Sequence, residues 1–223
     1  MRGRAWVLTS KKVALAAVSV WLILLVSGCG EPQEPAANQV NQLVLSGQKI
    51  DQSLKDLSRL EQEDMALYKS VLDKGKNKNS DIEALLDQAG NHINERRMVL
   101  KQAEGVMKQT NEDTADLRVS LKELSFENEE TLAQAEKVLD QYEARARTFE
   151  NFVVSYQHSL EADEQLYGLM RKSVDPNLVK IKRAIRVRNS EYTKLAEIRK
   201  QFNLQTKAFN GANAKLVQMD QEG

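Results

Sequence analysis

Cysteine, proline, glycine and aromatic residues are all scarce in this chain of 223 residues. The single cysteine excludes an internal disulfide, and three prolines with ten glycines leave few positions for turns. Aromatic residues make up only 5%, and both tryptophans, Trp6 and Trp21, lie within the first 28 residues, which argues against a lectin-like site later in the chain. A regular chain that is 41% hydrophobic and 29% charged predicts one all-helical domain.

Histidine is equally scarce, and neither copy lies in a catalytic motif. A di-iron helix bundle needs paired Glu-x-x-His motifs, whereas Ala89 and Ser155 stand three residues before His92 and His158. No serine lies in a Gly-x-Ser-x-Gly sequence, and no glycine-rich phosphate loop is present. We therefore expect two solvated histidines, no metal, no cofactor and no enzymatic activity.

Formal charges cancel over the whole chain but not within its parts. Residues 1–28 carry four basic residues and no acidic residue, which leaves 28 basic against 32 acidic residues from Cys29 onward. A mildly acidic mature protein is a poor candidate for general nucleic-acid binding, so we expect no nucleic-acid partner.

The first 28 residues have the organisation of a secretory signal peptide. A basic segment precedes an apolar run from Val13 to Val26, which is shorter than the ~20 residues that span a bilayer. The run ends in Ser27-Gly28-Cys29, which resembles the lipobox of bacterial lipoproteins, where small residues precede a cysteine that receives a diacylglyceryl group. We predict lipidation of Cys29, a linker over residues 29–37, and a mature protein anchored on the outer face of the cell membrane.

The central stretch of the chain carries an almost unbroken heptad repeat. Steps of four and three residues from Leu132 to Val174 meet apolar residues at every position except Asp163. Weaker stripes of the same kind run from Leu43 to Val71, from Ile82 to Leu124 and from Leu178 to Leu216. Such repeats are typical of helices whose narrow apolar seams face one another.

Three breaks divide these stripes into four expected helices. A turn at Gly75–Asn79 ends a helix over about 38–73, and Ser80–Glu83 reads as a capping box for the next. The second and third seams fall out of phase near Ser125–Asn128, either through a turn or through a stutter inside one long helix. Asp175-Pro176 is a strong start for the last helix, with Asp175 as its N-cap, and Asn210-Gly211 is expected to fray or break its end.

Matched helix lengths and short connections favour antiparallel neighbours. We predict an elongated up-and-down four-helix bundle over residues 38–223, or a three-helix arrangement if the second and third helices form one rod. Four aromatic residues of the seams are expected in the core rather than at a ligand site: Tyr142, Phe149, Tyr156 and Tyr167.

Three charged residues also fall on the expected seams: Arg96, Asp163 and Arg188. They would either line an internal polar pocket or fix the register with their stems packed at the edge of the bundle. The second role is the commoner one for polar seam residues.

Residues 171–200 hold ten basic and only three acidic residues. The candidate ligand-binding residues of this segment are Lys180, Lys182, Arg183, Arg186 and Arg188. They would bind a phosphate-rich polymer or an anionic lipid surface, or else they complement acidic helices of the same bundle, for instance residues 112–130.

The lipobox, the short linker, the breaks near Gly75-Lys76-Asn77 and at Asp175-Pro176, and the charged heptad-like helices together resemble the YkyA-like cell-wall-binding lipoproteins of Gram-positive bacteria. The resemblance implies a four-helix bundle outside the cell that binds a wall polymer, peptidoglycan or teichoic acid, without catalysis. The alternative function is a helical adaptor or spacer that binds a protein partner at the cell surface.

Overall fold

The structure is a computed structural model that describes residues 36–75, 82–121, 129–171 and 177–222. Four helices account for nearly all of them: α1 (Ala36–Gly75), α2 (Glu83–Leu121), α3 (Glu129–Arg171) and α4 (Leu178–Glu222). The predicted signal peptide and Cys29, most of the predicted linker, and the predicted turns at residues 76–79 and 125–128 lie outside the described residues.

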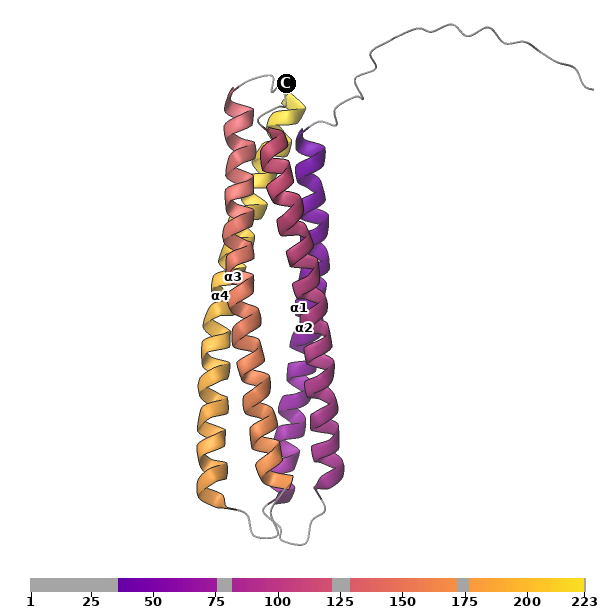
Figure 1. The fold of residues 1–223 in the computed structure, drawn as a ribbon, viewed down its shortest axis with the longest axis vertical. Coiled ribbons are helices and arrows are strands. Elements are labelled where there is room, and N and C mark those ends of the chain that lie inside the picture. The colour runs from indigo at the N-terminus through magenta and orange to yellow at the C-terminus, as the bar shows by residue number, and fades with distance from the viewer. Residues whose placement is uncertain (1–35, 76–81, 122–128, 172–176, 223) are drawn as a thin grey trace, which may run out of the picture. The chain divides into compact units, whose positions relative to one another are not determined.

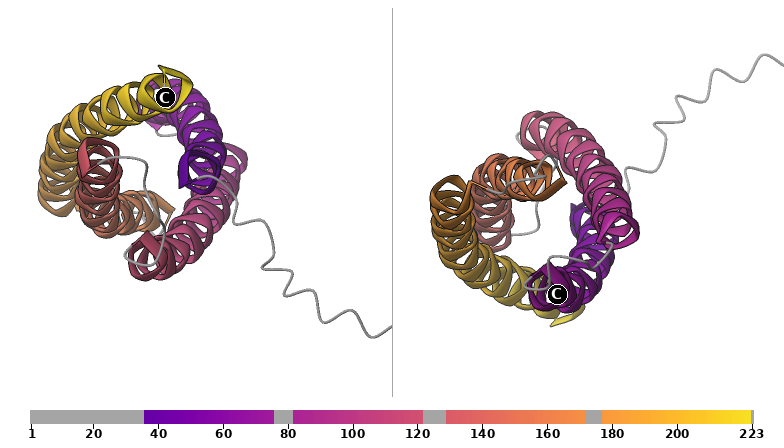
Figure 2. Two further views of the ribbon diagram at one scale, coloured as in Figure 1. Left: turned by 90° about the horizontal axis from the view of Figure 1, so that it is seen from above. Right: turned by 90° about the horizontal axis from the view of Figure 1, so that it is seen from below.

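The helices form an up-and-down bundle in which α1 and α3 run one way and α2 and α4 the other (Figure 1). Seen along its length, the bundle is a ring in which α1 neighbours α2, and α3 neighbours α4 (Figure 2). α2 and α3 also pack side by side as two separate helices. The four-helix prediction is therefore confirmed, and the alternative of one long rod through residues 122–128 is wrong.

The seams predicted from the heptad pattern face the core. In α3, the seam is buried without interruption from Ala135 to Tyr167, and its four aromatic residues are all buried. Tyr142 packs edge-on against Phe209 of α4, with ring centroids 5.5 Å apart. The buried hydrophobic side chains of the described residues lie between Leu43 and Leu216, and a chain that starts at Gly30 contains them all.

The start of α4 differs from the prediction by two residues. Asn177, not Asp175, is the N-cap, because its Oδ1 atom accepts a hydrogen bond from the Lys180 backbone N–H at 3.1 Å. Asp175 and Pro176 themselves lie outside the described residues, as do Ser80 and Asp81 of the predicted capping box. Leu178, which was expected on the seam, is exposed.

The end of α4 also differs, because the helix runs through Asn210-Gly211 to Glu222. Phe209, Ala212 and Leu216 are buried around this point. In addition, the Gln134 side chain of α3 donates a hydrogen bond to the Ala212 carbonyl at 2.7 Å. Tertiary packing thus overrides the low helix propensity of Asn-Gly.

Candidate functional site

A layer of buried charges crosses the bundle with one residue from each helix. This polar layer consists of Asp64, Arg96, Asp163 and Arg188, all 2% exposed or less. Arg96 Nη2 donates to Asp163 Oδ2 at 2.8 Å, and Arg188 Nε donates to Asp163 Oδ1 at 2.6 Å. Asp64 lies between the same two guanidinium groups, at 3.6 Å from Arg96 and 3.3 Å from Arg188.

Tyrosine hydroxyls complete the polar layer. Tyr192 donates to Asp163 Oδ2 at 2.6 Å and accepts from Arg96 Nη1, also at 2.6 Å. Tyr167 donates to Asp64 Oδ1 at 3.4 Å. Both carboxylates are thus surrounded by donors, as buried charges require.

The polar layer keeps its arginines charged. Burial alone would lower the pKa of Arg96, but Tyr192, Asp64 and Asp163 outweigh it and the pKa is raised. Burial also acts to lower the pKa of Arg188, but the pKa is raised overall, mainly by Asp163. The pKa of Asp64 is raised by burial, although Arg96 acts in the opposite direction. Two guanidinium groups therefore face two carboxyl groups, with no surplus charge to attract a ligand.

Sequence reasoning placed three of these four residues on seams and missed Asp64. The residue lies four positions after Leu60 and three before Leu67, both buried, so the spacing of the first stripe would have shown it. Arg188 was also predicted to belong to a ligand-binding surface, and this was wrong. Its guanidinium points into the core, where Asp163 and Asp64 hold it and the Tyr68 ring lies 4.4 Å away.

The other four candidate residues lie on the outside of α4, near its start. Lys180, Lys182, Arg183 and Arg186, which we call the basic surface, are all exposed. Arg183 lies three residues from Lys180 and three from Arg186, and Lys182 lies four before Arg186, so the side chains are neighbours on the helix. Within the described residues, none of the four forms an ion pair.

A groove between α3 and α4 adjoins the basic surface. It encloses about 480 Å³, and its lining includes Lys180 and Arg183 beside Gln165, Leu169, Ala184 and Val187. The neighbouring Leu178 and Val179 are exposed as well. Cations and apolar groups thus share one end of α4.

Two further basic residues of this segment form ion pairs with other helices of the bundle. Arg171 pairs with Asp87 of α2 at 2.6 Å, and Arg199 pairs with Glu61 of α1 at 2.6 Å. The acidic segment at residues 112–130, suggested as the internal complement, supplies none of the ion pairs that α4 forms within the described residues. Internal pairing therefore accounts for part of the basic run, and among the described residues it does not involve the basic surface.

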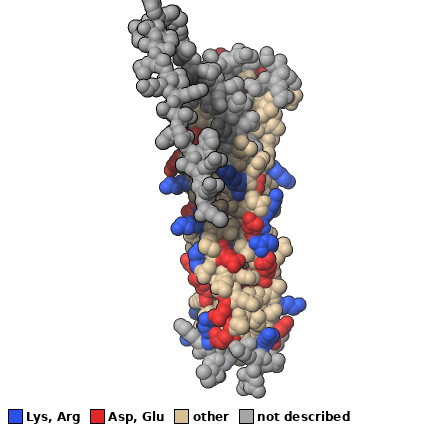
Figure 3. All heavy atoms as spheres, turned by 90° about the vertical axis from the view of Figure 1, so that its right-hand side faces the viewer, with Lys and Arg blue, Asp and Glu red and all other residues tan. Residues whose placement is uncertain are grey.

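Among the described residues of the face formed by α1 and α2, charges of one sign do not gather in this way (Figure 3). The face that contains α1 and α2 carries acidic and basic side chains interspersed (Figure 3). His158 is exposed as predicted, whereas His92 is half-buried with its Nδ1 atom enclosed. Across residues 36–75, 82–121, 129–171 and 177–222, no cluster of three His, Cys, Asp or Glu side chains is arranged to hold a metal ion. No helix within these ranges combines the length and apolarity needed to cross a membrane.

Comparisons with known proteins agree with the expected family. A family model described as "Putative cell-wall binding lipoprotein" and named YkyA matches residues 31–219. The chain is also 22% identical over 203 residues to an uncharacterized lipoprotein YkyA of Bacillus subtilis (strain 168), an alignment that covers 87% of each chain. No solved structure matches.

Proposed function

Because the chain belongs to the YkyA family of lipoproteins, we propose that it is held at the outer face of the cell membrane by a lipid on Cys29 and binds an anionic wall polymer through its basic surface. The family description and the name of the relative support the lipoprotein part and a wall partner. The observation that carries the mechanism is the set of four exposed cations without an ion-pair partner in the described residues.

The charge of the basic surface is available because the rest of the fold does not use it. Arg188, two residues after Arg186 on α4, is paired with buried carboxylates, and Arg199 is paired with Glu61. Lys180, Lys182, Arg183 and Arg186 instead face solvent, where four neighbouring cations attract phosphate or carboxylate groups over a Debye length of ~8–10 Å.

The position of the basic surface favours a target in the wall over the anchoring membrane. α1 starts at Ala36, at the end of the bundle opposite to the start of α4 (Figure 1). The seven residue steps from Cys29 to Ala36 reach at most about 25 Å. The 40 residues of α1 then extend about 60 Å further at 1.5 Å per residue. The basic surface therefore lies at the end of the bundle remote from the start of α1, which supports a target other than the anchoring membrane.

The chemistry of the groove supports a flexible phosphate-rich chain, such as a teichoic acid. Lysine ammonium groups act as point charges toward phosphate, and arginine adds paired donors. The apolar lining from Leu169 and Val187 offers contact for the carbon backbone of such a polymer. We therefore rank teichoic acid above peptidoglycan as the ligand.

Sedimentation with purified walls tests the proposal. The chain from Gly30 onward is incubated with Gram-positive walls, with and without their teichoic acid, at low and high salt. The test variant reverses the basic surface (K180E, K182E, R183E, R186E). A matched control reverses four exposed lysines of α1 and α2 (K55E, K69E, K101E, K108E), so that net charge changes equally. Circular dichroism confirms that each variant is folded.

We expect the test variant to lose about tenfold or more of its wall binding at low salt, while the control retains most of it. Removal of teichoic acid from the walls, or addition of salt, should lower the binding of the unmodified protein to a similar extent. Equal losses in the two variants would reject the basic surface as the binding site. Binding to anionic phospholipid vesicles without binding to walls would assign the surface to lipid, and crosslinking of one protein partner independently of wall polymer would assign the adaptor function.

A further inference from the structure

A third arginine is buried in the half of the bundle that lies far from the basic surface, and its charge is not balanced as in the polar layer. Arg145 of α3 is 1% exposed. Its Nε atom donates to Thr206 Oγ1 at 3.0 Å, and its Nη2 atom donates to Asp51 Oδ1 at 3.2 Å. Asp51 is itself 45% exposed, so water screens its charge. Burial lowers the pKa of Arg145, although Asp51 acts to raise it.

The Nη1 atom of Arg145 has no hydrogen-bond partner, although it is enclosed. Two phenylalanine rings fix the guanidinium plane, with the Phe202 centroid 4.9 Å and the Phe209 centroid 6.0 Å from Cζ. The group cannot turn away without losing these contacts and the bond to Thr206. A buried guanidinium nitrogen without an acceptor is unusual, because burial of such a donor has a cost in free energy.

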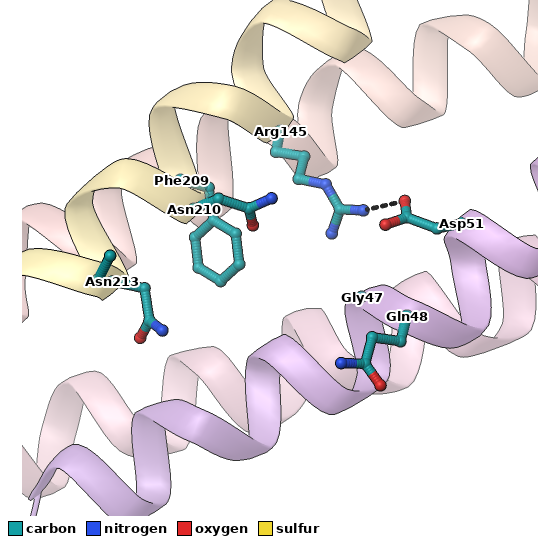
Figure 4. Close-up of a pocket in the computed structure, with 8 residues that line it drawn as sticks. Gly47, Gln48, Asp51, Arg145, Phe209, Asn210 and Asn213 are labelled. Carbon is teal, nitrogen blue, oxygen red and sulfur yellow. Dashed lines mark hydrogen bonds and ion pairs between the residues drawn. The ribbon is translucent and has the colours of Figure 1, made fainter. Parts of the chain in front are cut away.

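A cavity of about 220 Å³ lies in front of this nitrogen, between α1 and α4 (Figure 4). Gly47 forms the wall opposite Arg145, and a Cβ atom at this position would lie 3.2 Å from Nη1. Asn213 also lines the cavity, and its Oδ1 atom is likewise enclosed without a partner. Gln48 and Asn210 form the rim as exposed side chains with no hydrogen bond in the described residues. Because Nη1 is enclosed, a ligand reaches it only when the side chains around it move.

We propose that this cavity binds the carboxylate of a small acylamino acid, such as the C-terminal end of a peptide. The carboxylate accepts from Arg145 Nη1, and the neighbouring amide group meets the side chain of Asn213. A monoanion suits the site better than phosphate, because Asp51 repels a dianion about twice as strongly. The site does not depend on the basic surface, which lies at the other end of the bundle.

The experiment uses N-acetylalanine, as both enantiomers, with the chain from Gly30 onward. Ligand-observed NMR gives the affinity, N-acetylalaninamide supplies a neutral control, and inorganic phosphate tests the choice of anion. Two variants bear on the site without removing the arginine. Gly47→Ala narrows the space before Nη1, and Asp51→Asn removes the competing carboxylate. Gly105→Ala is the matched control, because its Cβ would meet open space in the middle of α2.

We expect N-acetylalanine to bind and its amide to fail. Gly47→Ala should weaken binding about tenfold, Gly105→Ala should leave it unchanged, and Asp51→Asn should tighten it roughly fivefold because a screened like charge is removed. Absence of binding at tens of millimolar would overturn the proposal. So would binding that is unchanged in both Gly47→Ala and Asp51→Asn, or phosphate that binds more tightly than the carboxylate.

Discussion

Arg96 of α2 donates a 2.8 Å hydrogen bond to Asp163 of α3 with both side chains fully buried. The next residue of each helix repeats the arrangement in solvent, because Arg97 and Glu164 pair at 2.8 Å with 46% and 49% of their side chains exposed. One pair of helices therefore carries the same interaction in two environments, which separates the effect of burial from that of geometry.

Loss of the buried ion pair should lower the free energy of unfolding much more than loss of the exposed one. Asp163→Ala leaves Arg96 and Arg188 with a single carboxylate, so we expect the free energy of unfolding to fall by about 3–5 kcal/mol. Glu164→Ala should lower it by at most about 1 kcal/mol. Urea unfolding followed by circular dichroism measures both. Losses of similar size would show that burial does not raise the cost of leaving an arginine of the polar layer without its partner.

All five tyrosines should resist ionisation while the bundle is folded. Burial raises the pKa of each one above its ordinary value of 10.0. The folded state then keeps protons that the unfolded state releases, so the stabilisation is complete below pH 10 and declines as pH rises above it. Most of the tyrosinate absorbance near 295 nm should therefore appear only together with loss of helical circular dichroism. An increase well before helix loss would contradict the raised values.

Asn177→Ala should destabilise the protein by about 1 kcal/mol, because it removes the acceptor of the Lys180 backbone N–H at the start of α4. Asn203→Ala, at an exposed position inside the same helix, serves as the control and should be neutral or slightly stabilising. The midpoint of thermal unfolding compares the two variants. If Asn177→Ala matched the control, the cap would lie elsewhere.

Cys29→Ala should abolish lipid labelling of the protein in growing cells, because this is the only thiol in the chain. Metabolic incorporation of a labelled fatty acid, followed by isolation of the protein, measures the effect. Substitution of Ser27 by threonine, which keeps the cysteine, should retain some label. Label that persists in Cys29→Ala would disprove the predicted anchor.

The heptad pattern was sufficient to predict the bundle, because the apolar positions of each repeat identify the face that the helix buries. The positions from Ala135 to Tyr167 are buried in the predicted order. Helix ends were predicted less well. The N-cap of α4 is decided by a local hydrogen bond between Asn177 and Lys180. The continuation of the helix through Asn210-Gly211 depends instead on the packing of Phe209 against other helices.

Sequence reasoning was weaker for the charged residues. Arg188 belongs to both the seam pattern, which predicts burial, and the basic run, which predicts exposure. It is buried because Asp64 and Asp163 of other helices pair with it in the core. Arg145 gave no signal at all, because it lies beside the seam, three residues after Tyr142, where an arginine usually extends to water. Its burial results from the approach of Gly47, whose missing side chain leaves room for the guanidinium group.

The polar layer crosses α4 at Arg188, only about three turns after the helix begins. Fraying or sliding of those turns would pull Arg188 from both carboxylates, so we expect the backbone amides beside it to exchange with deuterium only when the whole bundle opens. The part of α4 that presents Lys180 to Arg186 to solvent is thus pre-organised. A polymer that binds there loses conformational entropy only in the side chains and not in the helix backbone.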